Sequence, residues 1–410
     1  MTHPLAHRMH AIKPSPTLAA GAKAKALMAE GRDIIDLTLG EPDFDTPEHI
    51  KAAAVEAIKR GDTKYTPVDG TAALKKAIVE KFRTQNGLEY TPAEITVGAG
   101  GKHVIYNAMV ATVDAGDEVM IPAPYWVSYP DIVLLAGGTP VFVNMPAANG
   151  FKLTPELLRA AVTPKTKWLI LNSPSNPCGA TYTRAELQAL ADELRNHPHV
   201  MVMSDDLYEH IVYDGLEFVT IAALDADVKS RTLTVNGVSK AYAMTGWRIG
   251  FAGGPKWLID AMRMLQSQST SNPSSISQAA AVAALSGDHK IIRERTAEFK
   301  TRRDKTAEWL NAIPGVKCHK PEGSFYLYPS FETFMGATTP DGKVLADDTA
   351  LCMYLLEGVG VAVVMGSAFG TPGFLRISYA TSLAKLEEAC KRIAKAVGEL
   401  KLPNGKACAA

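Results

Sequence analysis

The feature that most constrains the fold of this chain is a regular alternation of short apolar and amphipathic segments from about residue 95 to 255. Apolar segments typical of buried strands begin near Glu94, Glu118, Thr139, Trp168, Val200, Thr232 and Arg248. Helical patterns between most of them begin near Lys102, Val127, Thr154 and Thr183. This alternation predicts an α/β fold in which a mostly parallel sheet carries helices on both faces.

The flanking segments predict further helices and a second unit. A first helix is expected over Pro16–Gly31. A second is expected to begin at Thr46-Pro47, with Thr46 as its cap and Pro47 in its first turn. A third is expected over Thr71–Gln85 and ends at Asn86-Gly87. The charged stretch Lys290–Ala312 is interpreted as a solvated helical connector. An α+β unit follows, with strands near Val316, Phe325, Val361 and Leu375, helices over Asp347–Glu357 and Ser382–Leu400, and a frayed tail over Asn404–Ala410.

Composition excludes several classes of function. Lysine plus arginine equals aspartate plus glutamate, 43 each, so no excess charge favours nucleic acid or an anionic membrane. No apolar run reaches the roughly 18 residues that a membrane span needs, and the first residues lack a signal-peptide core. The five scattered cysteines and the absence of an HExxH motif predict a cytoplasmic protein with reduced thiols and no metal site.

A lysine and an arginine follow the strand predicted near residue 232. Lys240 comes after the apolar residues Leu233 and Val235, and Arg248 stands eight residues later. A lysine fixed at a strand end deprotonates more easily, and its neutral amine forms a Schiff base with a carbonyl. An arginine can bind phosphate with two parallel hydrogen bonds. The pair indicates a cofactor with an aldehyde and a phosphate, which is pyridoxal 5'-phosphate, PLP.

Polar residues also end two other predicted strands. Asp205 ends one of them and could hold a pyridine nitrogen protonated, while Tyr208 could reach the ring's phenolic oxygen. Asn176 lies in the loop after the strand at residue 168 and could meet the same oxygen. The competing interpretations are a helix cap formed by Asp205 and Asp206, and an ordinary strand-to-helix turn around Asn176.

A glycine-rich turn precedes the helix predicted at residue 102. The segment Gly98–Lys102 could present free N–H groups to a phosphate. It is not a Walker loop, because no serine or threonine follows Lys102, and His103 stands where a dinucleotide fingerprint needs its last glycine.

Together these segments resemble the class I, fold-type I, PLP-dependent aminotransferases, over nearly the whole chain and in the family's order. The bacterial branch of aspartate aminotransferases is the most similar. Its motifs recur as Gly40–Pro47, Lys64–Pro67, Pro124–Pro130, the Asn176 loop, Ser204-Asp205 with Tyr208, Lys240 with Arg248, and Leu375–Ala380.

The resemblance implies a role for each candidate residue. Lys240 is implied to be the cofactor anchor and the general base. The other implied cofactor contacts are Asp205 at the pyridine nitrogen, Tyr208 and Asn176 at the ring oxygen, Trp126 on the ring face, and Gly101, Lys102, Ser239, Arg248 and the partner subunit's Tyr65 at the phosphate. The substrate contacts are implied to be Arg376 at the α-carboxylate with Gly40, Trp126 and Asn176, and Lys13 and Lys102 at a distal carboxylate.

Two positions depart from the family pattern. Gly237 stands where many relatives have serine, so a phosphate contact is either missing or supplied by Ser239. Cys178 stands where threonine is usual, which we expect to affect packing more than chemistry.

The resemblance also implies the domain organisation and the reaction. A small domain is expected from residues 1–45 and 301–410, a large PLP domain from 46–300, and a homodimer with shared active sites. The reaction implied is amino transfer from aspartate to 2-oxoglutarate, with prephenate as a further acceptor. The segment 265–273 contains no basic residue, and the resemblance implies that Lys13 and Lys102 supply the cation that a second carboxylate needs. The competing interpretation of Lys13 is a solvated charge in the N-terminal tail.

Other functions are kept as alternatives or set aside. An aminotransferase for aromatic or neutral amino acids is the main alternative, and a carbon–sulfur lyase is a second one of the same fold. A DNA-binding regulator would need a basic winged-helix extension, and a nicotinamide-dependent oxidoreductase would need the glycine fingerprint that is absent.

Overall fold

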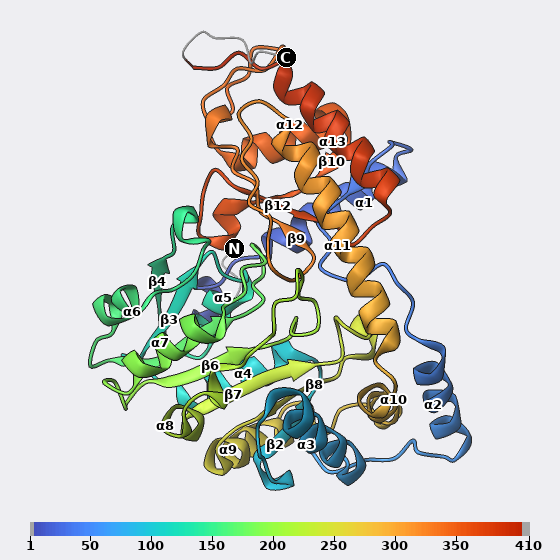
Figure 1. Cartoon of the computed structure of the whole chain (residues 1–410), viewed down its shortest axis with the longest axis vertical. Coiled ribbons are helices and arrows are strands. Elements are labelled where there is room, and N and C mark those ends of the chain that lie inside the picture. Colours follow the sequence, from blue (N-terminus) through green and yellow to red (C-terminus); the bar gives the residue numbers. More distant parts are fainter. Residues whose placement is uncertain (1–3, 404–410) are drawn as a thin grey trace.

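The computed structural model describes residues 4–403, and the middle part of this range is arranged around one central sheet (Figure 1). In this part of the chain that sheet has seven strands in the order β2-β8-β7-β6-β5-β3-β4. The strands are β2 (Ile95–Gly98), β3 (Glu118–Ala123), β4 (Thr139–Asn144), β5 (Thr166–Asn172), β6 (Met201–Asp205), β7 (Thr232–Gly237) and β8 (Gly250–Gly253). Only β8 runs antiparallel to its neighbours, which confirms the predicted mostly parallel sheet.

Helices cover both faces of this sheet, because successive residues of its strands point to opposite sides. In β5, Leu169 packs against α6 and α7, whereas Ile170 belongs to the cluster that contains α4, α5 and α9. The helices are α2 (Glu48–Lys59), α3 (Ala72–Asn86), α4 (Gly101–Thr112), α5 (Ser128–Leu135), α6 (Pro155–Ala161), α7 (Arg184–Leu194), α8 (Ala226–Ser230), α9 (Lys256–Ser267) and α10 (Ser275–Ser286).

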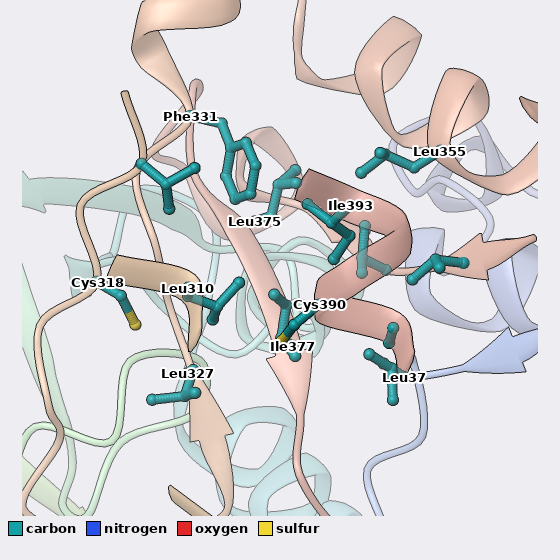
Figure 2. Close-up of a cluster of buried hydrophobic side chains, with 14 of the residues drawn as sticks. Leu37, Leu310, Cys318, Leu327, Phe331, Leu355, Leu375, Ile377, Cys390 and Ile393 are labelled. Carbon is teal, nitrogen blue, oxygen red and sulfur yellow. The ribbon is translucent and has the colours of Figure 1, made fainter. Parts of the chain in front are cut away.

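A second unit, built from both ends of the described chain, sits above the sheet in Figure 1. Near the N-terminus it includes α1 (Pro16–Ala29) and β1 (Ile35–Asp36), and β1 pairs with β10 (Val361–Ala362). The other elements are α11 (Lys290–Asn311), β9 (Tyr326–Leu327), α12 (Asp348–Val359), β11 (Val364–Met365), β12 (Leu375–Ser378) and α13 (Leu383–Gly398). Figure 2 shows part of their shared apolar core, to which Leu37, Leu327, Ile377 and Ile393 all belong.

Several local predictions are confirmed, and others need correction. Thr71 caps α3 and Gly87 ends it with a left-handed φ of 66°, as predicted. Thr46 does not cap α2: Pro47 is its N-cap residue, and the Thr46 hydroxyl donates to the Ala243 carbonyl instead. No strand forms at Val316, where the backbone makes only an isolated bridge between Lys317 and Ser330. The predicted tail Asn404–Ala410 lies outside the described residues.

The interpretation of α11 as a solvated connector is wrong for its C-terminal half. Phe299, Arg302, Arg303 and Leu310 are buried there, because this half packs against the core of the second unit. The buried charge of Arg303 is compensated, because its guanidinium pairs with Asp214 at 2.8 Å and donates to a backbone carbonyl. Within residues 4–403, no helix is long and apolar enough to cross a membrane.

A buried ion pair fixes the segment that follows β6. Glu209 is paired with Lys81 of α3, and both side chains are almost fully buried. Asn86 bridges them, since its amide donates to Glu209 at 2.7 Å and its carbonyl oxygen accepts from Lys81 at 2.6 Å. The network ties α3 to the backbone that carries Asp205 and Tyr208.

Replacing Lys81 with methionine should therefore destabilise the protein strongly. The Glu209 carboxylate would remain buried without its cation, which costs on the order of 3–5 kcal/mol. Chemical denaturation would measure the change. Lys59→Met is the matched control, because Lys59 forms an exposed pair with Glu56 and should matter by less than about 0.5 kcal/mol. Similar losses in both variants would contradict this account.

Candidate active site

A cavity of about 690 Å³ lies where strands of the central sheet end and the two units meet. In a parallel sheet the residues after the carboxyl ends of neighbouring strands come together, and α/β folds bind ligands there. The cavity gathers most of the candidate residues: Gly40, Gly101, Lys102, Trp126, Asn176, Asp205, Tyr208, Ser239, Lys240, Arg248 and Arg376.

The Lys240 amine lies in this cavity, just after β7. Its Nζ donates to the Gly40 carbonyl at 2.5 Å, which brings the N-terminal segment over the sheet edge. Burial lowers the pKa of Lys240 to about 8, and the nearby cation Arg376 adds to the effect. In a substantial fraction of the molecules the amine is therefore neutral near physiological pH, and in this form it can act as a nucleophile or a base.

Asp205 ends β6 and is held in place by neighbours that the sequence did not single out. The Tyr129 hydroxyl donates to Asp205 Oδ2 at 2.5 Å, and the Asn172 amide donates to the Asp205 carbonyl at 2.9 Å. Burial raises the pKa of Asp205 to about 6. A ligand nitrogen hydrogen-bonded to the Asp205 carboxylate would be stabilised in its protonated form.

Asp206 is directed away from the cavity, as the alternation of side chains along β6 requires. Its Oδ1 accepts a hydrogen bond from the Ser204 hydroxyl at 2.6 Å, and burial raises its pKa to about 7. Of the two aspartates, only Asp205 lines the cavity. Neither is the cap of a helix in the described chain, so the competing interpretation as a helix cap is wrong.

An anion-binding corner is formed by the start of α4 and by Arg248. No side chain caps α4, which begins at Gly101, so its first N–H groups are available to a ligand. Gly100 precedes it with a φ of 91°, and a Cβ at this position would lie 2.3 Å from Arg248 Nη2. Glycine is thus required for the guanidinium to reach the helix start. The Ser239 hydroxyl belongs to the same cavity.

Arg376 is another cation of the cavity, and its side chain is buried. Arg376 on β12 donates from Nη1 to Asn176 Oδ1 at 3.0 Å and from Nη2 to the Thr38 carbonyl at 2.6 Å. Its Nε is buried without a hydrogen-bond partner. An incompletely satisfied buried guanidinium is suited to a carboxylate. Because Asn176 uses its oxygen for Arg376, its amide N–H₂ group remains available to a ligand.

Trp126 and Lys102 form a further part of the wall. The Lys102 ammonium lies 5.0 Å from the centre of the Trp126 ring. Burial lowers the pKa of Lys102, and Arg248 contributes to this shift. The pair offers a flat aromatic face and a cation on the same side of the cavity.

Two candidate residues do not line this cavity. Lys13 is exposed in a separate hollow of about 430 Å³, beside Asp131. Tyr65 is 92% exposed. Neither position contributes to the cavity of its own chain.

Several lining residues were not among the candidates, and they differ in how visible they are in the sequence. Asn172 could have been found, because it ends β5 as Asp205 ends β6. Tyr129 stands three residues after Trp126, but nothing local indicates that it meets Asp205. Tyr326 of β9 has no local signal at all, since β9 is only two residues long.

The two departures from the family pattern have different surroundings. A Cβ at Gly237 would lie 3.1 Å from both Leu207 Cδ1 and the Ile249 carbonyl, so a side chain fits only if these neighbours shift. Cys178 is buried in an apolar cluster with Val127 and Phe151 and does not line the cavity. Burial raises the pKa of its thiol to about 11, which keeps it protonated and unreactive.

The residues fit a ligand with a carbonyl, a basic ring nitrogen and a phosphate. Lys240 offers a partly neutral amine, Asp205 a buried acid, and Arg248 with the uncapped start of α4 an anion cradle. This set defines the site as that of an enzyme working on a carbonyl cofactor and a carboxylate substrate.

Comparison with known proteins identifies the family. The model for aminotransferase class I and II matches residues 32–393, so the chain belongs to this family, whose members use PLP. The aspartate/prephenate aminotransferase of Cereibacter sphaeroides is 59% identical over 93% of this chain and 96% of its own length. An aspartate aminotransferase of Rhizobium meliloti is 57% identical over 96% of each chain.

Solved structures agree with this placement. A crystal structure of the aspartate aminotransferase from Rhizobium meliloti superposes with a TM-score of 0.94 at 56% identity, covering 97% of this chain and all of that one. The aspartate aminotransferase from Thermus thermophilus with maleate gives 0.89 at 43% identity, covering 96% and 100%. The predicted family and fold class are confirmed, and the protein is an aminotransferase.

The lowered pKa of Lys240 has a measurable consequence. The rate at which added PLP becomes reducibly attached to the cofactor-free protein should rise with pH to a plateau, with a midpoint near 8. The neutral amine is the reactive form, and it dominates above its pKa. Borohydride trapping at a series of pH values would measure this rate. Lys240→Arg is the control without attachment, and a midpoint near 10, as for an ordinary lysine, would contradict the prediction.

The two neighbouring aspartates should behave very differently. Asp205→Asn should lower kcat by at least about a hundredfold, because a charge-assisted hydrogen bond in a desolvated site is lost. Asp206→Asn keeps the shape of a buried group outside the cavity and should lower kcat less than about fivefold. Steady-state kinetics with matched thermal denaturation would separate activity from folding. The opposite ranking would show that Asp206 is the functional acid.

Proposed function

We propose that this aminotransferase holds PLP on Lys240 and transfers the amino group of aspartate to 2-oxoglutarate. One observation carries the proposal: a buried amine of lowered pKa shares a single cavity with the acid Asp205 and the carboxylate-binding cation Arg376. A regulator or an oxidoreductase would not need these three groups together.

The cofactor contacts follow from the walls of the cavity. Asp205 would hold the pyridine nitrogen, and Tyr208 and Asn176 the ring oxygen. The phosphate would lie at the start of α4, bound by the backbone of Gly101 and Lys102 and by Arg248 and Ser239. Trp126 would cover the ring face. When bound, PLP supplies an electron sink for the negative charge that develops at the substrate Cα.

The chain's own residues would carry out the steps around that sink. Arg376 binds the substrate α-carboxylate and orients the Cα–H bond. The Lys240 amine would take the proton from Cα as general base. Its low pKa suits it to both accept and return a proton near neutral pH. Gly40 holds this amine through its backbone carbonyl, and Tyr326 lines the same cavity.

The preference for a dicarboxylate is supported by the relatives and by Lys102. Relatives 53–59% identical over nearly the full chain are named aspartate or aspartate/prephenate aminotransferases, and the Thermus thermophilus enzyme was crystallised with the dicarboxylate maleate. Lys102 lines the cavity beside Trp126, where it could pair with a distal carboxylate. Aspartate fits this arrangement better than an aromatic or neutral amino acid.

Prephenate is the second acceptor that we propose, on the strength of the same relatives. Lys13 would reach a distal carboxylate only if its segment moved from the hollow it occupies beside Asp131. We also propose a cytoplasmic homodimer, in which the highly exposed Tyr65 reaches the phosphate of the partner's site.

An amino-donor panel with 2-oxoglutarate would test the substrate. Aspartate should give the highest kcat/KM, and Lys102→Met should lower it by about thirtyfold or more, since a carboxylate left unpaired in a closed site costs about 2 kcal/mol or more. The Lys13→Met variant tests the N-terminal lysine separately, through kcat/KM measured with aspartate as the amino donor and with prephenate as the acceptor. Losses should be confined to substrates with a second carboxylate.

The control for this panel is Lys165→Met, which removes an exposed lysine outside the cavity. It should leave every rate unchanged. Equal losses for aspartate and for neutral donors in Lys102→Met would mean that Lys102 serves the cofactor alone. A higher kcat/KM for aromatic than for acidic donors in the unaltered protein would favour the alternative substrate class.

A further inference from the structure

We infer that Tyr326 is a positioning residue that joins the two halves of the site: its hydroxyl polarises Tyr208, and its ring supports Arg376. The inference rests on the proposed function and adds a residue to it. Tyr326 belongs to β9, whereas Tyr208 follows β6 of the large sheet, so the contact crosses from one unit to the other.

The hydroxyl contact is specific and shielded from water. Tyr326 is fully buried and Tyr208 nearly so, and their hydroxyl oxygens lie 3.0 Å apart. The two rings also make an edge-to-face contact, with centres 5.9 Å apart and an interplanar angle of 72°. A hydrogen bond in such a dry place is sensitive to the loss of either partner.

The ring of Tyr326 has a second neighbour. The Arg376 guanidinium lies 4.6 Å from its centre, in the geometry of a cation–π contact. Tyr326 is also paired with Ser378 across the β9–β12 ladder, two residues beyond Arg376. The ring therefore supports the arginine that is proposed to bind the substrate carboxylate.

The position of the hydroxyl is fixed from a third side. A Cβ at Gly40 would lie 3.1 Å from Tyr326 Oη, so the N-terminal segment packs directly on this atom. The Gly40 carbonyl in turn accepts from Lys240. One buried hydroxyl thus touches Tyr208 and the segment bonded to Lys240.

Either hydroxyl of the pair can donate in this geometry. A proton donated by Tyr326 leaves the Tyr208 proton free for a ligand in the cavity, which both residues line. Tyr208 then accepts from Tyr326 and donates its own proton onward, to the ring oxygen of a bound cofactor. Hydrogen bonds in such a chain strengthen one another.

Two substitutions separate the two roles. Tyr326→Phe keeps the ring under Arg376 and removes only the hydroxyl, whereas Tyr326→Leu removes both. The matched control is Tyr328→Phe, which deletes another buried hydroxyl two residues away, bonded to Thr371 at 2.5 Å and outside the cavity.

The first readout is the pH midpoint of the visible absorbance of protein-bound PLP. A weaker donor at the ring oxygen stabilises the deprotonated cofactor less. Tyr326→Phe should therefore raise the midpoint by about 0.1–0.7 unit, the equivalent of 10–30% of a charged hydrogen bond. Tyr208→Phe should raise it further. Tyr328→Phe should leave it unchanged.

The second readout is KM for the amino donor. Tyr326→Leu should raise it roughly tenfold through the loss of the cation–π contact, whereas Tyr326→Phe should change it less than about twofold. If Tyr326 were only structural, the variants would differ in thermal stability, but their KM values would not rank in this order.

Each failure points to a different conclusion. If the unaltered protein shows no absorbance from bound PLP, the proposed function fails and this inference with it. If PLP binds and the midpoint of Tyr326→Phe matches that of Tyr328→Phe, or falls, the positioning role of the hydroxyl is overturned while the proposed function stands. Equal KM values in Tyr326→Leu and Tyr326→Phe would overturn the role of the ring.

Discussion

The burial of the Lys240 amine is the interaction on which the rest of the site depends. A lysine at the edge of an open sheet would face water and stay protonated at neutral pH. Here the second unit covers the sheet edge, and Gly40 accepts the amine's hydrogen bond while Arg376 adds a repelling charge. Desolvation and repulsion act in the same direction, so the amine is partly neutral near pH 8. Covering the sheet edge is thus a chemical requirement as well as a packing one.

The two units divide the recognition between them. Groups suited to a cofactor come from the large sheet: Asp205 after β6, Lys240 after β7 and the start of α4. The carboxylate-binding group, Arg376, comes from β12 of the second unit. The contacts that link the two sets, Tyr326 with Tyr208 and Arg376 with Asn176, are all buried. A shift of one unit against the other would therefore change the surroundings of Lys240, Asp205 and Arg376 together.

Charges inside the protein are tolerated where each has specific partners. Buried Glu209 is paired with Lys81 and bonded to Asn86, and buried Arg303 is paired with Asp214; none of these residues lines the cavity. They hold the segment after β6 and the connecting helix α11 in place. In the site itself satisfaction is incomplete, since Arg376 Nε is buried without a partner. Arg376 lines the cavity, so a bound carboxylate could satisfy this nitrogen.

The sequence by itself determined the parallel sheet and the groups at the ends of its strands. Hydrophobic alternation is a local property, and a parallel sheet brings successive strand ends to one edge, so Asp205, Asn176 and Lys240 could be placed together without coordinates. Only the tertiary structure decided which groups close over them. Tyr129 and Tyr326 approach from elements distant in sequence, Lys13 lies outside the cavity, and half of the charged helix α11 is buried. These outcomes depend on how one unit packs against the other, and no local pattern records that packing.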